Sequence, residues 1–281
     1  MEVSAHEAPV PAGIERIRAH NPGPLALTGT NTYLVGEPAF VIDPGPADAA
    51  HIESVWEAAV RRGGIEGIAI THRHIDHAGA AAVLRERSRA PLAAAPEPRE
   101  RSRVEEAVTR GLEVDVVLAD GDAFGPLRAI ATPGHAADHL AYIHGTVLFS
   151  GDAILGVGSV VIAPGEGGLG AYLHALRRLL ELDLTTICPG HGPVVEDAHA
   201  KVTEYIEHRL DRERRLVAAL DRGLRRRSEL LDAAWDDVPA VLRPAAALAL
   251  EAHLEKLEAE QRLPEGVERL VGGVEGLAEL G

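Results

Sequence analysis

The amino-acid sequence predicts an α/β domain followed by a mainly helical appendage. Over about the first 195 residues, short apolar runs alternate with amphipathic stretches and Gly/Pro turns, a pattern typical of strands and helices in succession. Beyond that point the apolar residues recur mainly at helical spacing. The chain has 281 residues, which is long for one domain and short for two full ones. We therefore predict a main domain over 1–196 and a C-terminal domain over 197–281.

The first predicted elements run from residue 31 to residue 88. The segment 31–43 indicates two strands around a turn at Gly36–Pro38. Residues 48–64 have apolar positions at helical spacing, with Gly63 where a helix-ending glycine belongs. Residues 65–71 form a short apolar run that predicts a buried strand, and 79–88 predicts a helix.

The second set of elements completes the main domain. Residues 113–135 predict a hairpin with its turn at Asp120–Asp122, and 139–152 predicts two more strands about Gly145. A helix over 170–182 then leads to a strand within 184–193 that ends in a Pro/Gly turn. The polar segment 96–111 is compatible with a loop or a short helix.

The C-terminal domain shows three helical patterns, over 197–223, 228–236 and 244–261, and a predicted short β-tail over 266–273. This order is compatible with a winged-helix-like module. Because 201–281 carries more acidic than basic residues, DNA is an improbable partner. We expect instead a role in packing, as a lid, or in forming a homodimer.

Composition narrows the class of protein. The formal net charge of −15 disfavours, without excluding, a nucleic-acid substrate. The single cysteine, Cys188, is typical of a reducing compartment, and we expect it to be buried. The N-terminal stretch lacks the basic and apolar regions of a secretory signal, and no apolar run is long enough to cross a bilayer. We therefore expect a cytoplasmic protein that does not associate with membranes.

The stretch THRHIDHAGA, residues 71–80, places three imidazoles and a carboxylate within six positions, directly after a predicted strand. Three further residues of the same kinds each follow a glycine near the end of a strand-like segment. The seven candidates are His72, His74, Asp76, His77, His135, Asp152 and His191. Imidazole and carboxylate are ligands for zinc and similar metals, and glycine lets the backbone approach an ion closely. Together they favour a metal site over a set of solvated turns.

The HxHxDH pattern with the later His, Asp and His resembles the metallo-β-lactamase-fold hydrolase superfamily, from about residue 12 to residue 196. The segments HNPGPLALTGTNTYLVG, TPGHAADHLAYI, LFSGDAILGVG and YIEHRLDRE look more narrowly like its β-lactamase-like protein 2 branch. The resemblance implies a four-layer αββα sandwich with metals at the strand-end edge. It also implies that the helical, winged-helix-like C-terminal appendage belongs to the same family pattern.

Carried over residue by residue, the resemblance assigns His72, His74 and His135 to one metal. It assigns Asp76, His77 and His191 to a second, with Asp152 bridging the two. Two divalent ions about 3.5–4 Å apart can share and activate a water. We therefore expect a bridging hydroxide as nucleophile, positioned through Asp76 and Asp152. Zinc is the default metal, and manganese or iron(II) could replace it.

Other side chains are candidates for supporting roles. Asp43, at the end of a predicted strand, is a turn residue or, as the resemblance favours, a residue that orients a ligand. Thr71, Ser150 and Asp138 are weaker candidates for the same role. The resemblance also suggests that Thr30, Asn31 and Thr32 line substrate space, with a simple hairpin turn as the alternative.

The remaining histidines are not expected to bind metal. The resemblance places His139 near the site but outside the ligand set. We expect His51, His199 and His253 at the surface, and we expect His174 and His208 to be solvated or capping residues on helices.

Three functions are compatible with this pattern. The first is hydrolysis of a small ester or thioester. The second is endoribonuclease or phosphodiesterase activity on single-stranded RNA, which would require a basic, aromatic-lined approach to the metals. The third is a non-catalytic metal-binding interaction module. A single-iron persulfide dioxygenase is a further relative, and β-lactamase activity is improbable without an export signal. The fold does not choose the substrate among them.

Overall fold

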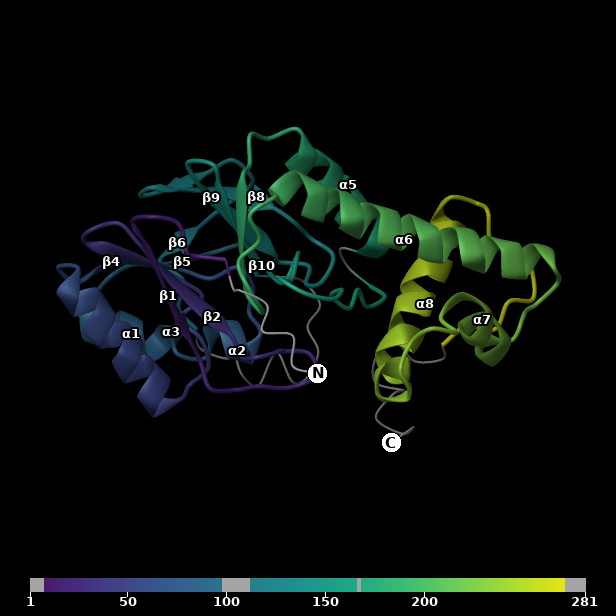
Figure 1. The fold of residues 1–281 in the computed structure, drawn as a ribbon, viewed down its shortest axis with the longest axis horizontal. Coiled ribbons are helices and arrows are strands. Elements are labelled where there is room, and N and C mark those ends of the chain that lie inside the picture. The colour runs from purple at the N-terminus through teal and green to yellow at the C-terminus, as the bar shows by residue number, and fades with distance from the viewer. Residues whose placement is uncertain (1–7, 98–111, 166–167, 271–281) are drawn as a thin grey trace.

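The computed structural model describes residues 8–97, 112–165 and 168–270. Two β-sheets face each other in the part of the molecule drawn in purple to teal, and helices cover their outer faces (Figure 1). A long helix then leads to a smaller body of helices at the right of the same view. The predicted α/β domain with a helical appendage is confirmed.

The first sheet has six strands in the order β1-β2-β3-β4-β5-β6. The pairs β1–β2 and β2–β3 are antiparallel, while β3 to β6 run parallel. Its strands are β1 Ile14–Arg18, β2 Asn31–Val35, β3 Ala39–Ile42, β4 Ile65–Ala69, β5 Leu92–Ala94 and β6 Val116–Val117. The helices that follow its strands are α1 Ala49–Arg61, the single-turn α2 Ile75–Ala78 and α3 Ala81–Ser88.

The second sheet has five strands in the order β11-β10-β9-β8-β7, of which only β10 and β11 pair in parallel. Its strands are β7 Ala123–Phe124, β8 Leu127–Ala131, β9 Leu140–His144, β10 Val147–Gly151 and β11 Thr186–Pro189. Helix α5, Gly168–Leu180, connects β10 to β11, because two parallel strands need a crossover.

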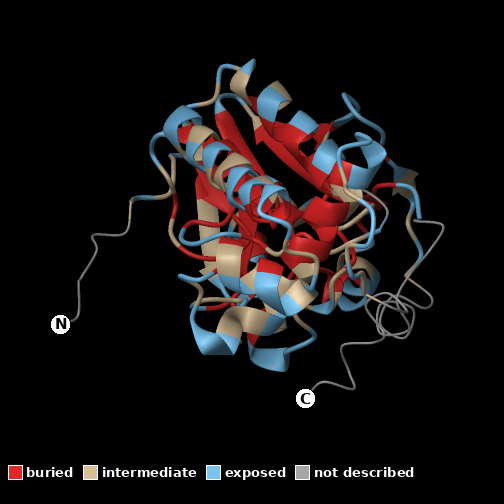
Figure 2. Ribbon diagram, turned by 90° about the vertical axis from the view of Figure 1, so that its right-hand side faces the viewer, coloured by how far each residue is buried: buried red, intermediate tan, exposed pale blue. Residues whose placement is uncertain are grey.

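Alternation along the strands builds a four-layer sandwich. Tyr33 and Val35 pack between the sheets, while Leu34 between them packs against α1 and α3. In the second sheet Phe149 faces the first sheet, and Leu148 packs against α5 and the next helix, α6. Figure 2 shows the buried residues concentrated in the strands and on the inner sides of the helices.

The C-terminal part consists of α6 Ala198–Asp221, α7 Arg227–Ala234, the 3-10 turn Ala240–Leu242 and α8 Arg243–Ala259. Helix α6 contributes to two cores. Its first half, with Val202 and Tyr205, packs in the core of the second sheet, and its second half, with Leu216 and Leu220, packs against α7 and α8. The predicted boundary at 196/197 therefore falls at the start of a helix that both parts share. That boundary stays a prediction.

Some sequence expectations were wrong in detail. The hairpin expected over 113–135 does not turn at Asp120–Asp122: that segment carries the chain from β6 in the first sheet to β7 in the second. Strand β5 was not expected, because three residues rich in alanine resemble a loop between prolines. Within the expected β-tail, residues 266–270 form no strand, and the rest lies outside the described residues, as does most of 96–111.

Among the described residues, no helix combines the length and the apolar character that crossing a bilayer requires. Formation of a homodimer also stays a prediction.

Candidate metal centre

One edge of the sandwich collects the polar residues that the sequence pattern singles out. Strands β3 and β4 run parallel in one sheet, and β8, β10 and β11 run in a common direction in the other. Their carboxyl ends therefore open onto the same edge. The residues that follow these five strand ends are Asp43, the 72–77 cluster, His135, Asp152 and His191. All seven sequence-predicted metal candidates meet there.

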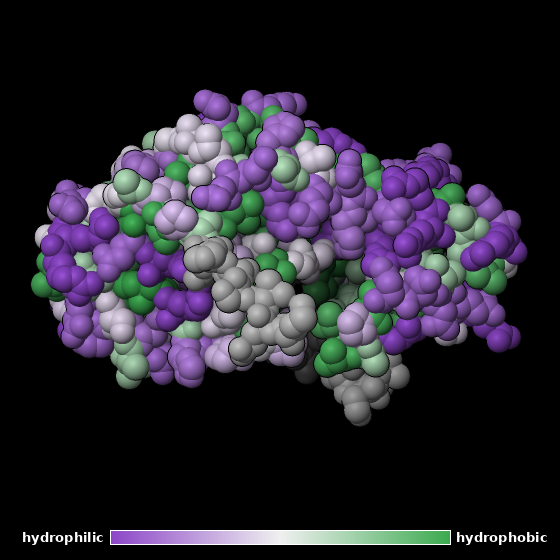
Figure 3. Space-filling model, viewed as in Figure 1, coloured by the Kyte–Doolittle hydropathy of each residue, from purple (hydrophilic) through white to green (hydrophobic). Residues whose placement is uncertain are grey.

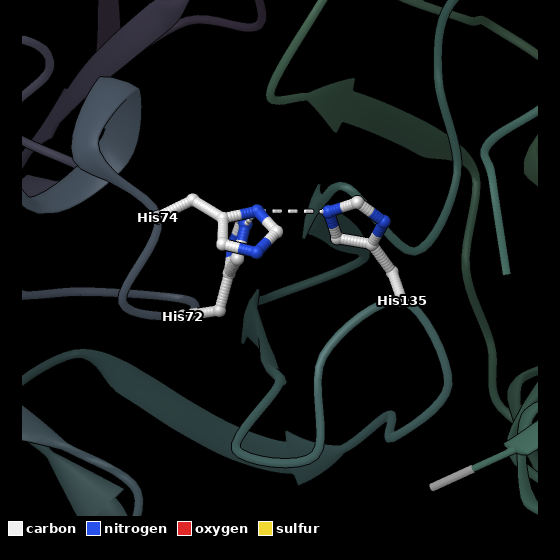
Figure 4. A group of neighbouring side chains, drawn as sticks. All are labelled: His72, His74 and His135. Carbon is white, nitrogen blue, oxygen red and sulfur yellow. Dashed lines mark hydrogen bonds between the residues drawn. The ribbon is translucent and has the colours of Figure 1, made fainter. Parts of the chain in front are cut away.

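His72, His74 and His135 form the first group (Figure 4). The Nε2 atom of His72 lies 2.9 Å from Nδ1 of His74, and Nε2 of His135 lies 3.0 Å from the same Nδ1. His72 and His74 follow β4 along one extended stretch, whereas His135 comes from the loop after β8. Three ring nitrogens from two segments therefore converge on one point.

Asp76, His77 and His191 form the second group. The Nε2 atoms of His77 and His191 are 3.3 Å apart, and Oδ2 of Asp76 lies 3.2 Å from Nε2 of His191. Asp152 connects the two groups. Its Oδ1 lies 3.4 Å from Nε2 of both His77 and His191, and its Oδ2 lies 3.5 Å from Nε2 of His135.

Hydrogen bonds behind two of the imidazoles determine which ring nitrogen carries the proton. Oδ2 of Asp43 lies 2.8 Å from Nδ1 of His77, so that nitrogen donates its proton and Nε2 keeps a lone pair. Thr71 donates its only hydroxyl proton to the same carboxylate oxygen. Because that proton is committed, Thr71 must accept from Nδ1 of His72, 3.0 Å away. His72 therefore also turns an unprotonated Nε2 to the centre.

The other two imidazoles are oriented by backbone carbonyls. Nδ1 of His135 lies 3.0 Å from the carbonyl oxygen of Val161, and Nδ1 of His191 lies 3.3 Å from that of Gly29. In the neutral form of each ring this nitrogen donates, which leaves Nε2 with a lone pair. In their neutral forms these four imidazoles turn lone pairs toward two carboxylates and His74, an arrangement that positive charge between its members stabilises.

A buried oxygen without a partner supports the same conclusion. Oδ1 of Asp152 has no hydrogen-bond partner among the described residues. A carboxylate oxygen that is buried and unpaired is costly, and a metal ion is one of the few groups that compensates for it. The donor set and this oxygen fit a divalent metal ion.

The charges at the centre act in the same direction. Burial by itself would raise the pKa of Asp152, but the charge of His77 and the contacts with His191 hold the pKa well below its usual range. Burial would likewise lower the pKa of His191, but the nearby carboxylates of Asp152 and Asp76 raise it to about 9. Burial, together with the electrostatic effect of the neighbouring imidazoles, lowers the pKa of His72, so that ring stays neutral. The carboxylates of the centre are therefore ionised, and their negative charge favours positive charge at the centre.

Two glycines make the close approach of the segments sterically feasible, as the sequence suggested. A Cβ atom at Gly190 would lie 2.7 Å from Cε1 of His77 and 2.8 Å from Oδ1 of Asp152. Gly151 has φ +48°, and a Cβ there would lie 2.5 Å from Oγ1 of Thr71. Side chains at these positions would push the candidate ligands apart.

Residues beside the centre behave partly as expected. Asp43 is buried, adopts φ +50° and accepts hydrogen bonds from His77 and from the backbone and hydroxyl of Thr71. Its orienting position agrees with the expectation. Asp138 instead pairs with Arg73 at 2.6 Å, and Ser150 donates to the carbonyl of Ile154, so neither contacts a ring of the centre.

Thr30 and Asn31 are fully buried, and the expectation that they line substrate space stays a prediction. Asn31 donates to the carbonyls of Pro189 and Gly192 on either side of His191, and Thr30 donates to Asp76 at 3.3 Å. Both therefore hold parts of the centre in place. Thr32 is buried as well and bonds to the Asp43 carbonyl.

His139 proves more important than the sequence pattern alone indicated. Its Nε2 accepts from the backbone N–H of Asp152 at 3.1 Å, its Nδ1 bonds to Thr132, and its ring stacks on His72. His139 belongs to neither group of candidate metal ligands, as expected, yet its hydrogen bond positions the backbone of Asp152. His51 and His253, expected at the surface, are buried. Nε2 of His51 bonds to the hydroxyl of Thr32, and Nδ1 of His253 donates to the carbonyl of Ala249.

A cavity of about 290 Å³ begins at His135 and Asp152 and extends toward the C-terminal helices. Most of its lining is apolar, from the loop around Leu27, from residues 155–161 and from the C-terminal part with Trp235 and Leu242. Figure 3 shows apolar residues in a hollow between the two parts of the molecule. Leu25 and Val157, which line the cavity, are 63% and 55% exposed, so the entrance is also apolar.

Comparison with known proteins agrees with this geometry. Residues 25–191 match the family model of the metallo-β-lactamase superfamily, and residues 228–265 match that of the β-lactamase-associated winged helix domain. A β-lactamase-like protein 2 homolog from Caenorhabditis elegans is 36% identical over 87% of this chain and 83% of its own length. An atrochrysone carboxyl ACP thioesterase from Aspergillus fumigatus is 30% identical over 81% of this chain and 75% of its own. The chain spans 64% of a lactamase-like protein from Aspergillus niger that is 36% identical.

Solved structures show the same fold. A metallo-β-lactamase family protein from Thermus thermophilus superposes with a TM-score of 0.69 at 26% identity, covering 89% of this chain and 94% of that one. Another protein, crystallised in a di-iron-bound form, superposes with a TM-score of 0.53 at 29% identity, covering 66% of this chain and 96% of its own. The family and the winged-helix appendage predicted from the sequence are thus confirmed. The chain belongs to the metallo-β-lactamase superfamily and is a metal-dependent hydrolase of that superfamily.

Proposed function

We propose that this protein is a binuclear metal-dependent hydrolase of esters or thioesters with an apolar acyl group. His72, His74 and His135 would hold one divalent ion, and Asp76, His77 and His191 a second. Asp152 would bridge them, because its two oxygens point to different groups. Zinc is our first choice of metal, although the di-iron-bound relative indicates that this fold also accepts iron.

When bound, two divalent ions would supply Lewis-acid chemistry, activating water at neutral pH and polarising a carbonyl. The contribution of the protein is to hold the donor atoms in place. Asp43 keeps the lone pair of His77 directed inward, and the Val161 carbonyl does the same for His135. The ionised Asp76 and Asp152 balance the charge of the ions and can take up or release a proton as the reaction proceeds.

The observation that carries this proposal is the apolar cavity that starts at His135 and Asp152. A group at the His135 and Asp152 end of it lies beside the candidate centre. An apolar lining with a few polar groups is typical of a small-molecule site. An acyl chain would bury its surface there, while its carbonyl carbon stays within reach of the metals.

The same cavity gives little support for RNA. Two arginines contribute to its lining, and both are engaged within the protein. Arg209 donates to the carbonyl of Val160, and Arg212 pairs with Asp237 and donates to the carbonyl of Ala234. An RNA site needs cationic side chains that remain available to phosphates. The ribonuclease alternative therefore stays a prediction without a specific observation in its favour.

The names of relatives supply a second argument. Two proteins named atrochrysone carboxyl ACP thioesterase, at 30% and 32% identity, act on a carrier-bound thioester according to those names. The name does not transfer with the similarity, but it agrees with an acyl group in the cavity.

The test is a substrate panel with zinc-loaded and manganese-loaded protein. We expect hydrolysis of acyl thioesters, increasing with acyl length, and no cleavage of single-stranded RNA. His74→Ala should abolish activity, and His174→Ala, which changes an exposed histidine on α5, should leave it unchanged. RNA cleavage without thioester hydrolysis would replace this proposal with the ribonuclease. Metal-loaded protein inert toward both would favour the binding module.

A further inference from the structure

The two domains contribute opposite walls of the cavity. One wall comes from the main domain, through the candidate centre, the loop containing Leu27, and residues 155–161. The other comes from the C-terminal part, through α6, Trp235 and the start of α8. The metal-binding residues and the residues that would contact the far end of an acyl group therefore lie in different domains. Specificity toward the acyl group is thus a property that the C-terminal part can supply.

His208 is the unusual residue of that second wall. It lies on α6 and lines the cavity, yet its Nδ1 atom is buried and has no hydrogen-bond partner among the described residues. Burial, helped by the charges of Arg209 and Arg212, lowers its pKa to about 4. The ring is therefore neutral at neutral pH, with one N–H and one lone pair. Arg209 and Arg212 beside it each donate hydrogen bonds within the protein, although Nε of Arg209, like Nδ1 of His208, has no partner among the described residues.

Nδ1 of His208 has almost no accessible surface, so a ligand in the cavity can reach the imidazole only through the other atoms of the ring. His208 is not part of a metal site, because it belongs to none of the groups of possible metal ligands among the described residues. Capping is also excluded, since it lies within the middle turns of a helix of 24 residues. A ligand oxygen in the cavity can therefore meet the imidazole only at Nε2, the second polar atom of a ring that lines the cavity.

We propose that His208 determines specificity, by hydrogen-bonding a hydroxyl or carbonyl oxygen carried on an otherwise apolar acyl group. This inference rests on the proposed function, which places the reacting carbonyl at the His135 and Asp152 end of the same cavity. The rest of the acyl group then extends between Leu155 and the C-terminal helices. A hydroxylated acyl chain is preferred over the unsubstituted chain of the same length.

The test measures binding rather than turnover. Trp235 lines the cavity, and Trp56→Phe leaves it as the only tryptophan of the chain, so its fluorescence reports on occupancy. The probes are pairs of six-, eight- and ten-carbon alkanoates and their ω-hydroxy forms, the acids that thioester hydrolysis would release. They are titrated into zinc-loaded Trp56→Phe protein, and into the same protein carrying His208→Leu, His208→Gln or His199→Leu.

We expect one hydroxyalkanoate to bind about 5- to 10-fold more tightly than its unsubstituted partner, which is the contribution of one hydrogen bond. His208→Leu should reduce that ratio to about one while leaving binding of the plain alkanoate within about twofold. His208→Gln should restore part of the ratio. His199→Leu, an exposed position at the start of the same helix, should not change it.

A ratio that His208→Leu leaves unchanged would overturn the proposal, and so would the absence of any binding by the alkanoates. The outcome is separable from that of the proposed function. If the expected binding pattern occurs but no thioester is hydrolysed, the assignment of the reaction fails and the role of His208 in ligand recognition stands. If thioesters are hydrolysed without any effect of His208 on the ratio, only the role of His208 fails.

Discussion

Replacing Asp43 by asparagine should remove metal from the second group without touching any ligand. The carboxylate of Asp43 accepts three hydrogen bonds, from the backbone and hydroxyl of Thr71 at 2.7 and 2.8 Å and from Nδ1 of His77 at 2.8 Å. In Asp43→Asn the carbonyl oxygen can still accept from the Thr71 backbone. The new amide then faces two groups that both donate. His77 can relieve this conflict only by moving its proton to Nε2, the nitrogen that faces Asp152.

The expected magnitude follows from that tautomer change. Loss of a residue that orients a metal ligand typically lowers metal affinity about 10- to 100-fold, which corresponds to roughly 1.4–2.7 kcal/mol. The loss should affect the ion held by Asp76, His77 and His191. The group of His72, His74 and His135 should change less, because its members are oriented mainly by other oxygen atoms.

The assay is metal analysis after dialysis, followed by titration with a chelator of known affinity. We expect the variant to retain about one ion where the wild-type protein retains about two. The matched control is Glu251→Gln, which also converts a buried carboxylate to an amide but lies in α8, where it bonds to Arg269 and to the Leu270 backbone. The control should lose stability and keep its metal. If Asp43→Asn binds two ions with wild-type affinity, the tautomer argument is wrong.

Three further predictions concern sterics, the cavity and pH. Gly190→Ala should lower metal content and activity together, because its Cβ would lie 2.7 Å from the ring of His77, whereas Gly170→Ala, with no atom within 4 Å, should be neutral by both measurements. Ala245→Phe narrows the cavity, so kcat/KM for long acyl thioesters should fall at least about tenfold relative to kcat/KM for acetyl thioesters. The metal content should not change. An equal loss for long and acetyl thioesters would contradict an acyl-binding cavity. Burial lowers the pKa of His253 from its ordinary 6.5 to about 4. Between these values the unfolded chain binds a proton that the folded chain does not, so the free energy of unfolding should fall as pH falls through this window, by up to about 3 kcal/mol. Urea titrations of His253→Gln should show a flatter dependence, and identical slopes would refute it.

Residues that the chain places close together were predictable from the sequence. His72, His74, Asp76 and His77 occupy six positions, and the chemistry of imidazole and carboxylate points to metal whatever the surrounding fold. The glycines before His135, Asp152 and His191 were also informative. The structure shows why for Gly190 next to His191, since any side chain there would collide with the centre.

Errors arose where local pattern and tertiary context disagree. Residues 113–135 have hairpin-like turn residues, but β6 pairs with β5 in the first sheet, whereas β7 belongs to the second sheet. His253 looks like a surface residue on an amphipathic helix. It is buried because the carbonyl of Ala249 accepts from Nδ1, the one N–H of the neutral ring, and no periodicity reports such a partner.

The sequence by itself determined the class of chemistry and the α/β layering, because ligand types and the alternation of apolar residues along strands are properties of short segments. Tertiary structure decided which oxygen atoms orient each imidazole, that Thr30 and Asn31 bond to parts of the centre, and that His208 lines the same cavity as His135. Those outcomes depend on contacts between residues that are 46 to 162 positions apart in the sequence, or on residues from both domains that line one cavity. The energy of such contacts depends on their mutual geometry, which exists only once the layers have packed.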